Sequence, residues 1–428
     1  MIDKKFKADT WASYLAQAVS IASGFVYMAL VTRYAGIAVF GALTVLTALS
    51  NMLANLLTFR TNEAVIAFYK QGEATGDLAR SKFALVAGMT LDLLLGAGLF
   101  LLVYSQAETI ADLLIKDAGA APAVRLYAGF LFIFFIRGSA VGYLQARERF
   151  KLVNYLSMGE HFSKALAAGG MVMLYGSLEL HHAVLAVLVP ACVFSLVFLS
   201  AIGAGLARRL GTVPLSLDKG KAEEFARFSG STFLSSTLKA GNQNIDTVVV
   251  GYLTDTHTVG LYGLFRQFLS PLAFLSTPFS SLTYPKFVQA VIERRHSDIR
   301  RTITTINRKL RMLFVAVLVV MVPVFPIYAG WIGLPLQWDK WLVLIMMTLT
   351  TVTIQQMWWA RPFSNAVNPN ISLRANLYAL VFVVVTIYPA TLWFGLAGAA
   401  GVMLTNALLQ RWYWTFSLDS VIGKHVHG

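Results

Sequence analysis

Residues 229–287 read SGSTFLSSTLKAGNQNIDTVVVGYLTDTHTVGLYGLFRQFLSPLAFLSTPFSSLTYPKF and contain two apolar segments joined by the polar turn Thr254–Thr258. Each segment is long enough to cross a bilayer, which takes about 20 residues of helix. The pattern therefore predicts two consecutive transmembrane helices, and it is the starting point for interpreting the rest of the chain.

Polar residues interrupt the first of these two segments. They are Lys239, Asn242, Gln243 and Asp246. Their spacing of i, i+3, i+4 and i+7 puts them on one face of a helix. A charged side chain at the bilayer centre costs about 2.5–3.5 kcal/mol on insertion scales, so this face must meet a cavity or a partner rather than lipid. The segment is predicted to form one wall of a polar cavity inside a membrane bundle.

The composition extends this interpretation to the whole chain. Of the 428 residues, 57% are hydrophobic and 13% are charged, and the mean hydropathy is +0.64. A soluble domain has about 25% charged residues, so the composition indicates a polytopic membrane protein. The single cysteine, Cys192, excludes a disulfide within the chain and a zinc site built from several cysteines.

The net charge of +14 does not indicate nucleic-acid binding, because the basic residues lie in short loops between apolar segments. There is also no Walker A sequence, nucleophile elbow or metalloprotease pattern. We therefore expect a protein that is not an enzyme, has no cofactor and does not bind nucleic acid.

Apolar windows predict about twelve transmembrane helices. The basic N-terminus Met1–Lys7 precedes the apolar run Thr10–Val31, which is too long for the apolar region of a signal peptide and is expected to be a retained first span. With the N-terminus inside, few basic residues fall on the outer side. These are Arg33, Lys116, Arg125 and Lys340. By the positive-inside rule both termini are expected to be cytoplasmic.

The two halves of the sequence resemble each other. The turn Tyr34–Ala42 joins the first two spans, and the turn Tyr252–Tyr262 joins the seventh and eighth. Matching Gly41 to Gly260 gives an offset of 260 − 41 = 219, close to half the chain. Internal repeats with a substrate site at their interface are a recurring plan in transporters. We predict an all-α integral membrane protein with two pseudo-symmetric six-helix lobes, residues 1–210 and 211–428, around a central cavity.

Several short motifs then resemble a known family. They are Arg33-Tyr34-Ala35-Gly36 with Phe40-Gly41, the sequence Asp246…Val249-Val250-Gly251-Tyr252, the turn Val259-Gly260-Leu261-Tyr262, and Pro285. Their order and spacing are similar to those of the polysaccharide flippases, the O-antigen and exopolysaccharide exporters of the multidrug/oligosaccharidyl-lipid/polysaccharide superfamily. The resemblance implies a V-shaped pair of six-helix lobes that open alternately to each side of a bacterial plasma (inner) membrane.

The candidate substrate-binding residues are mostly cations within predicted spans. They are Arg60, Arg137, Lys164, Lys239, Asn242 and Arg266. Arginine binds phosphate oxygens with two parallel hydrogen bonds and lysine acts as a point charge, so a positive cavity suits an anionic head group. The acidic residues Asp246, Asp92 and Glu160 are candidates for ion coupling, because a carboxyl in an apolar site can take up a proton.

Structural roles compete with these functional ones. Glu160 and Lys164 are spaced i, i+4 and could neutralise each other on one helix. Arg60 lies near a span end, where its position is also explained by snorkelling to the membrane surface. Asp92 could serve only to neutralise a nearby cation.

The predicted function is translocation of oligosaccharide repeat units, for lipopolysaccharide or exopolysaccharide synthesis, from the inner to the outer leaflet by alternating access. The undecaprenyl-pyrophosphate carrier and partners such as a polysaccharide polymerase and chain-length machinery are implied by the resemblance. The main alternative is a cation-coupled multidrug antiporter of the same superfamily, which would need an acid-dominated cavity. A peptidoglycan-precursor flippase, typically longer by two spans, and a non-transporting scaffold for polysaccharide assembly are further alternatives.

Overall fold

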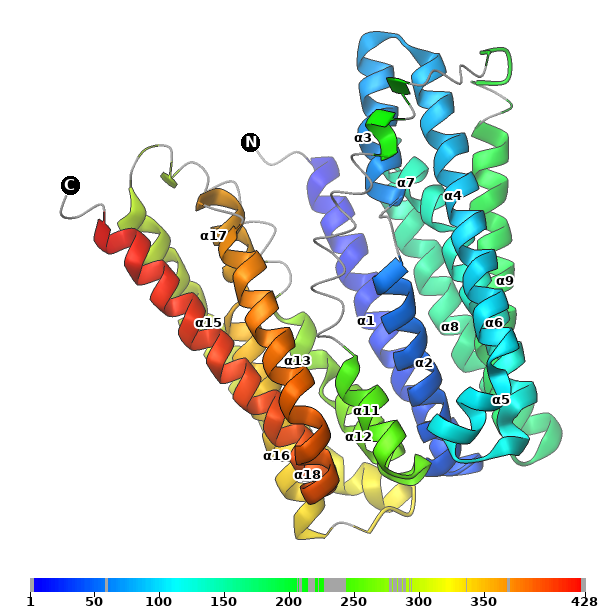
Figure 1. Cartoon of the computed structure of the whole chain (residues 1–428), viewed down its shortest axis with the longest axis vertical. Coiled ribbons are helices and arrows are strands. Elements are labelled where there is room, and N and C mark those ends of the chain that lie inside the picture. The colour runs from blue at the N-terminus through cyan, green and yellow to red at the C-terminus, as the bar shows by residue number, and fades with distance from the viewer. Residues whose placement is uncertain are drawn as a thin grey trace. The chain divides into compact units, whose positions relative to one another are not determined.

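The computed structural model describes residues 4–57, 61–205, 244–276, 295–335, 337–367 and 370–424, with shorter pieces of 206–226 and 279–293. The described residues are almost entirely helical (Figure 1). The chain divides into two compact units. Unit 1 comprises Met1–Asn244 and Asp255–Gly260, and unit 2 comprises Ile245–Thr254 and Leu261–Gly428. The lobe boundary at residue 210 stays a prediction.

Unit 1 contains nine α-helices among its described residues. They are α1 (Lys4–Tyr34), α2 (Ile37–Leu57), α3 (Thr61–Thr75), α4 (Leu78–Ser105), α5 (Ala107–Ile110), α6 (Ala121–Ile136), α7 (Gly138–Ala146), α8 (Phe150–Tyr175) and α9 (Leu180–Gly205). A π-helical turn, Ala111–Ile115, and a 3-10 turn, Ala118–Ala120, connect α5 to α6. The helix α1 packs along α8, and α4 packs between α3 and α6.

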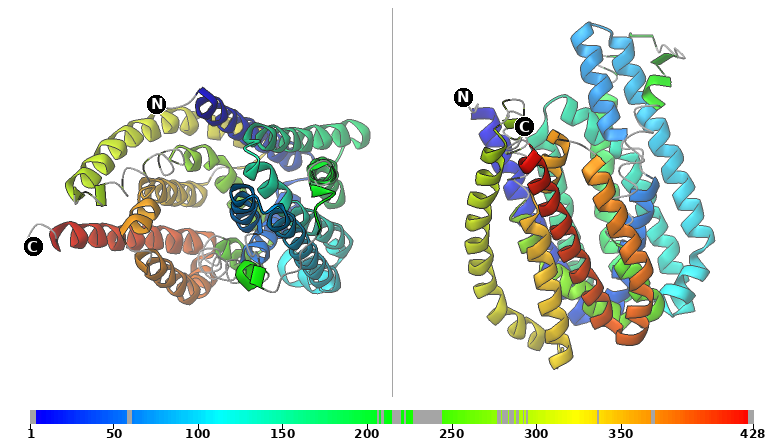
Figure 2. Two further views of the ribbon diagram at one scale, coloured as in Figure 1. Left: turned by 90° about the horizontal axis from the view of Figure 1, so that it is seen from above. Right: turned by 60° about the vertical axis from the view of Figure 1, so that its left-hand side comes forward.

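The described helices of unit 2 follow a similar order. They are α11 (Ile245–Leu253), α12 (Thr256–Phe268), α13 (Ser270–Phe274), α15 (His296–Trp331), α16 (Trp338–Gln356), α17 (Ala360–Val367) and α18 (Asn370–Lys424). The first turn of α12 belongs to unit 1. Within α18 the backbone is non-helical at Gly395, so this element is two helices that meet at a sharp bend (Figure 2).

Eight segments of the described residues are long and apolar enough to cross a membrane. One of them is Asn370–Val421, which contains the bend at Gly395 and so corresponds to two of the predicted spans. The predicted all-α membrane fold is confirmed, whereas the number of twelve spans stays a prediction.

The offset of 219 found in the sequence also relates helices of the first half of the chain to helices of the second half. Adding 219 to the first residue of α2 gives residue 256, where α12 begins, and adding it to the first residue of α4 gives 297, one residue into α15. The same offset takes Gly176, between α8 and α9, to Gly395, and both glycines have positive φ, +71° and +55°. The pair α8–α9 thus has its counterpart in the two parts of α18.

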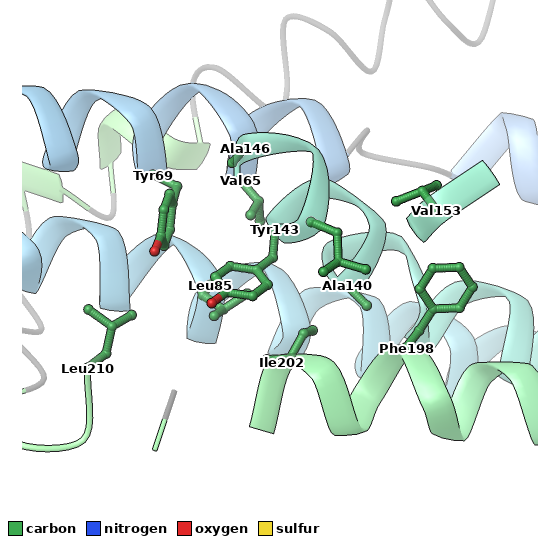
Figure 3. Close-up of a cluster of buried hydrophobic side chains, with 11 residues drawn as sticks. Val65, Tyr69, Leu85, Ala140, Tyr143, Ala146, Val153, Phe198, Ile202 and Leu210 are labelled. Atoms are coloured by element: carbon green, nitrogen blue, oxygen red, sulfur yellow. The ribbon is translucent and has the colours of Figure 1, made fainter. Parts of the chain in front are cut away.

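A hydrophobic cluster holds one end of unit 1 together (Figure 3). The rings of Tyr69 on α3 and Tyr143 on α7 meet edge to face with centroids 5.4 Å apart. Leu85 of α4 and Phe198 of α9 are fully buried in the same cluster. Leu210, which follows α9, completes it. The cluster therefore fixes α3, α4, α7 and α9 relative to one another.

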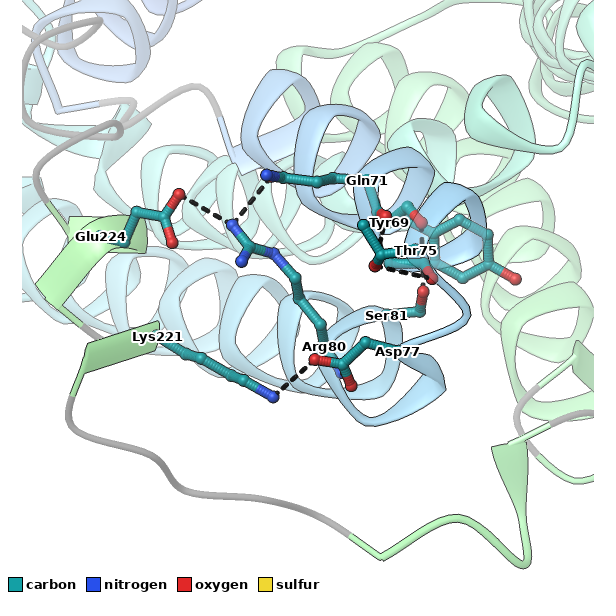
Figure 4. A network of polar contacts seen from close by, with 9 residues as sticks. Tyr69, Gln71, Thr75, Asp77, Arg80, Ser81, Lys221 and Glu224 are labelled. Carbon is teal, nitrogen blue, oxygen red and sulfur yellow. Dashed lines mark hydrogen bonds and ion pairs between the residues drawn. The ribbon is translucent and has the colours of Figure 1, made fainter.

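The segment after α9 docks on the end of the α3–α4 hairpin (Figure 4). Lys221 Nζ lies 2.9 Å from Asp77 Oδ2, and Arg80 Nη2 lies 2.8 Å from Glu224 Oε1. Phe225 packs edge to face on Phe68, with ring centroids 5.4 Å apart. The connection between the two predicted halves is therefore anchored on unit 1 by two ion pairs and a buried ring.

Candidate functional site

A cationic cluster lies in unit 1 where α6 ends and α7 begins. Arg137 occupies the single residue between these helices and forms an ion pair with Glu160 of α8. Both side chains are largely buried, with 21% and 14% exposed. The Arg137 guanidinium also lies 5.3 Å from the ring centroid of Phe134. The contact brings together two of the predicted site residues from different helices.

Lys164 lies one turn beyond Glu160 on α8. Its Nζ is 4.1 Å from the ring centroid of Tyr27 on α1, a cation–π contact. The Tyr27 hydroxyl donates a hydrogen bond of 2.9 Å to the carbonyl of Ala183 on α9. Within the described part of the chain Glu160 pairs with Arg137 and not with Lys164. Among these three charged side chains, Arg137, Glu160 and Lys164, there are therefore two cations and one carboxylate.

Asp92 of α4 lies nearby and is 2% exposed. It accepts hydrogen bonds from the backbone N–H and the hydroxyl of Ser139, both at 2.6 Å, and from the hydroxyl of Thr61. Each of these donors is uncharged. Asp92 thus links the first turns of α3 and α7 to the middle of α4.

A second polar cluster lies in unit 2. The Tyr262 hydroxyl donates a hydrogen bond of 2.6 Å to Asp246 Oδ2. Arg266, one turn further along α12, lies 3.6 Å from Asp246 Oδ1 and donates a hydrogen bond of 3.1 Å to the Thr247 hydroxyl. The Asp246 side chain is 5% exposed and that of Arg266 is 44% exposed. The buried carboxylate is thus paired with an arginine whose side chain is partly exposed.

The repeat offset connects the two clusters. Adding 219 to Tyr27 gives Asp246, and adding it to Lys164 gives Val383. Val383 belongs to a buried cluster of unit 2 against which Ile245, the neighbour of Asp246, packs, whereas Lys164 contacts Tyr27 in unit 1. The same packing position therefore carries a cation in one half and an apolar side chain in the other.

Other predicted site residues, Arg60, Lys239 and Asn242, lie outside the described residues. Sequence reasoning missed four partners in these clusters: Tyr27, Thr61, Ser139 and Tyr262. Tyr262 belongs to the turn that was compared between the halves, and the need of a buried carboxylate for donors was the signal that could have found it. Within the described residues, no three histidine, cysteine or acidic side chains gather in a way that could hold a metal ion.

A family model with the description "Polysaccharide biosynthesis protein" matches residues 6–291. The chain belongs to this family. The matched region includes the whole cationic cluster of unit 1 and both Asp246 and Arg266 of unit 2. A search of curated proteins found no match to this chain.

Solved structures with a similar fold are transporters and a flippase. An inward-facing multidrug resistance transporter of the MATE family, MOP superfamily, has a TM-score of 0.75 at 11% identity, over 97% of this chain and 99% of its own. The lipid II flippase MurJ in an inward closed conformation has a TM-score of 0.74 at 12% identity, over 96% of this chain and 87% of its own.

A third similar structure is a MOP superfamily transporter from Pyrococcus furiosus Vc1. It has a TM-score of 0.59 at 12% identity, over 98% of this chain and 97% of its own. Such low identities establish the fold. With the family match, they show that this polysaccharide biosynthesis family member has the fold of membrane transporters and of a flippase, and its long apolar helices indicate a multi-pass membrane protein.

Proposed function

We propose that this protein is a flippase that moves a lipid-linked oligosaccharide with a diphosphate head group from the inner to the outer leaflet of a bacterial plasma membrane. The observation that carries the proposal is the contact group of Arg137, Glu160 and Lys164 in unit 1, in which two cations accompany one carboxylate, while the nearby Asp92 contacts only uncharged donors. An excess cation in a largely apolar surrounding attracts an anion, because little water is present to screen it.

The two cations are suited to different parts of a diphosphate. The planar guanidinium of Arg137 can bind two phosphate oxygens side by side, whereas Lys164 offers a compact charge. The cation–π contact with Tyr27 holds Lys164 without neutralising it. Arg266, which is 44% exposed, is the corresponding candidate in unit 2.

The carrier and the direction of transport follow from the family resemblance. An undecaprenyl chain would stay in the bilayer while the sugar crosses, and both termini would lie in the cytoplasm. Partners such as a polymerase and chain-length machinery would act on the sugar after its release outside.

The multidrug antiporter alternative requires free carboxylates for a cationic substrate. Glu160 pairs with Arg137, Asp246 with Arg266 and Tyr262, and Asp92 accepts hydrogen bonds from Ser139 and Thr61. For the Pyrococcus furiosus transporter, a reverse polarity of the binding pocket suggests a different function. In this chain the two cations Arg137 and Lys164 beside Glu160 favour an anionic cargo.

The test is flipping of a lipid-linked oligosaccharide in proteoliposomes, followed by access of an enzyme that modifies the sugar from outside. Lys164→Gln should raise the cargo concentration for half-maximal flipping by about tenfold, the loss of one charge-assisted contact of about 1.4 kcal/mol. Lys164→Arg should keep most of the activity. The control is Lys151→Gln, an exposed residue at the start of the same helix. Equal activity of the two Gln variants would contradict the proposal, as would export of cationic drugs with no sugar flipping.

A further inference from the structure

We propose that Asp92 is a positioning residue for Arg137, and that its carboxylate fixes the helix break from which this arginine projects. The role of Arg137 in cargo binding rests on the proposed function above. The positioning itself is argued from the contacts of α4 with the break between α6 and α7.

The break leaves backbone groups of α7 in need of a partner. The first N–H groups of a helix have no acceptor within the helix and are usually satisfied by a side chain just before it. Here Arg137 occupies that place and its side chain makes no such bond. The N–H of Ser139 instead donates to Asp92 Oδ2 from another helix, at 2.6 Å. Asp92 therefore acts as the N-cap of α7 across the unit 1 core.

Gly138 allows this close approach. A Cβ atom on Gly138 would lie 3.1 Å from Asp92 Oδ2 and 3.4 Å from the hydroxyl oxygen of Thr61. The carboxylate is thus seated directly against the backbone between Arg137 and Ser139. Ser139 is completely buried and Thr61 is 5% exposed, so water does not compete for these bonds. An arginine whose backbone is fixed in this way loses less freedom when it binds a ligand.

The contacts of Asp92 favour this positioning role over the two roles expected from the sequence, which are ion coupling and neutralisation of a nearby cation. Its hydrogen-bond donors are the N–H and hydroxyl of Ser139 and the hydroxyl of Thr61, none of which is a cation to be neutralised. Positioning explains all three bonds, whereas ion coupling uses none of them.

The other half of the chain provides an internal comparison. The break between α16 and α17 in unit 2 is tied to α15 by a hydrogen bond of 2.8 Å from the Trp358 indole to Asn307. Trp358 is the residue that the offset of 219 relates to Ser139, and Gln356 is the one related to Arg137. Where no arginine occupies the break, a neutral pair makes the connection. The carboxylate of Asp92 is therefore found in the half of the chain where Arg137 occupies the helix break.

The first arm of the test does not depend on the cargo. The coupling between Arg137 and Glu160 is measured by a double-mutant cycle of thermal unfolding in detergent, with Arg137→Gln and Glu160→Gln, in the wild-type and Asp92→Ala backgrounds. We expect the coupling to be lost in the Asp92→Ala background. The control is Asp77→Ala, because Asp77 caps the first turn of the same helix α4 through the Arg80 N–H but lies away from the break. Unchanged coupling in the Asp92→Ala background would overturn the positioning role.

The second arm uses cargo flipping in proteoliposomes. Asp92→Ala should raise the half-saturating cargo concentration by about tenfold, as loss of a supporting contact behind a binding residue commonly does, and should add nothing to Arg137→Gln. Asp92→Asn, which keeps an acceptor for Ser139, should flip cargo like the wild type both with and without an ion gradient. A response to the gradient that the wild type shows and the Asn variant lacks would overturn the inference in favour of ion coupling. If the wild type flips no sugar while the first arm holds, the proposed function fails and the positioning stands.

Discussion

The helix α2 crosses the first turn of α12 with their backbones in contact at Gly41 and Gly260. Each glycine faces the backbone of the other helix. A Cβ atom on Gly41 would lie 1.7 Å from the carbonyl oxygen of Thr256, and one on Gly260 would lie 2.2 Å from the carbonyl oxygen of Ile37. The offset of 219 relates Gly41 to Gly260 and also Ile37 to Thr256. The contact within unit 1 is therefore reciprocal, like the self-complementary interface of a two-fold dimer.

Gly41→Ala is expected to destabilise the protein. In a free helix this change would stabilise by up to about 1 kcal/mol. Here the methyl group must displace the Thr256 carbonyl, and overpacking of this kind costs about 1–3 kcal/mol. The measurement is thermal unfolding in detergent. Gly170→Ala on α8 is the control, because a Cβ there meets nothing within 4 Å, and it should be neutral or stabilising. A Gly41→Ala variant as stable as this control would refute the close crossing.

Tyr262→Phe tests the hydrogen bond from Tyr262 to the buried Asp246 carboxylate in unit 2. The change removes the hydroxyl that donates to the buried Asp246. A hydrogen bond to a charged group contributes about 1.5–3 kcal/mol, and we expect a loss of that size in the free energy of unfolding. Tyr388→Phe, at a tyrosine that is 48% exposed, should change it by less than about 0.5 kcal/mol. Equal effects of the two variants would argue against the Tyr262–Asp246 bond.

The contact of the segment after α9 with the α3–α4 hairpin should weaken at acid pH. The hydrogen bond from Lys221, assisted by the N–H of Arg80, lowers the pKa of Asp77 below its usual value. A lowered pKa in the folded state means that the contact stabilises above the unfolded pKa of about 3.9 and is lost as the pH falls through the folded value. Hydrogen exchange of residues 223–226 should therefore be insensitive to pH from 7 to about 5, after correction for the intrinsic rate, and faster below about pH 4.

Asp77→Asn is the matched control for this effect. It removes the titrating group and should leave exchange in the docked segment without the acid transition. If the wild type and the Asn variant show the same transition, another carboxyl such as Glu224 is responsible, and the assignment to Asp77 is wrong.

Gly395→Ala tests the bend in α18. The residue has φ +55° and ψ −135°, a combination that side chains other than glycine rarely adopt, while a Cβ there meets nothing within 4 Å. The cost is therefore backbone strain of about 1–3 kcal/mol rather than a clash. Thermal unfolding measures it. Gly401→Ala, also without a neighbour within 4 Å but with ordinary helical geometry, should show no loss. A tolerated Gly395→Ala would mean that the bend is adaptable.

Much of the fold could be predicted because its signals are local or periodic. Apolar windows predicted the membrane helices, and the offset of 219 from Gly41 to Gly260 also relates the first residue of α2 to that of α12. Of the polar residues, Asp246 was proposed from its charge and its helical spacing and Arg266 from its charge within a predicted span, and the structure brings them together.

The side-chain partners were harder to predict. The i, i+4 spacing of Glu160 and Lys164 is visible in the sequence, but the partner of Glu160 is Arg137, which approaches from another helix. Such a contact depends on how α6 and α7 are joined. The link from Asp92 to Ser139 likewise spans 47 positions and has no periodic signature.

The helix α12 belongs to both units, since Thr256–Gly260 packs with unit 1 and Leu261 onward with unit 2. Its 13 residues form one hydrogen-bonded rod, and an α-helix bends little over about 20 Å. The boundary between the two units thus falls inside a continuous helix, at the peptide bond between Gly260 and Leu261, and not in a loop.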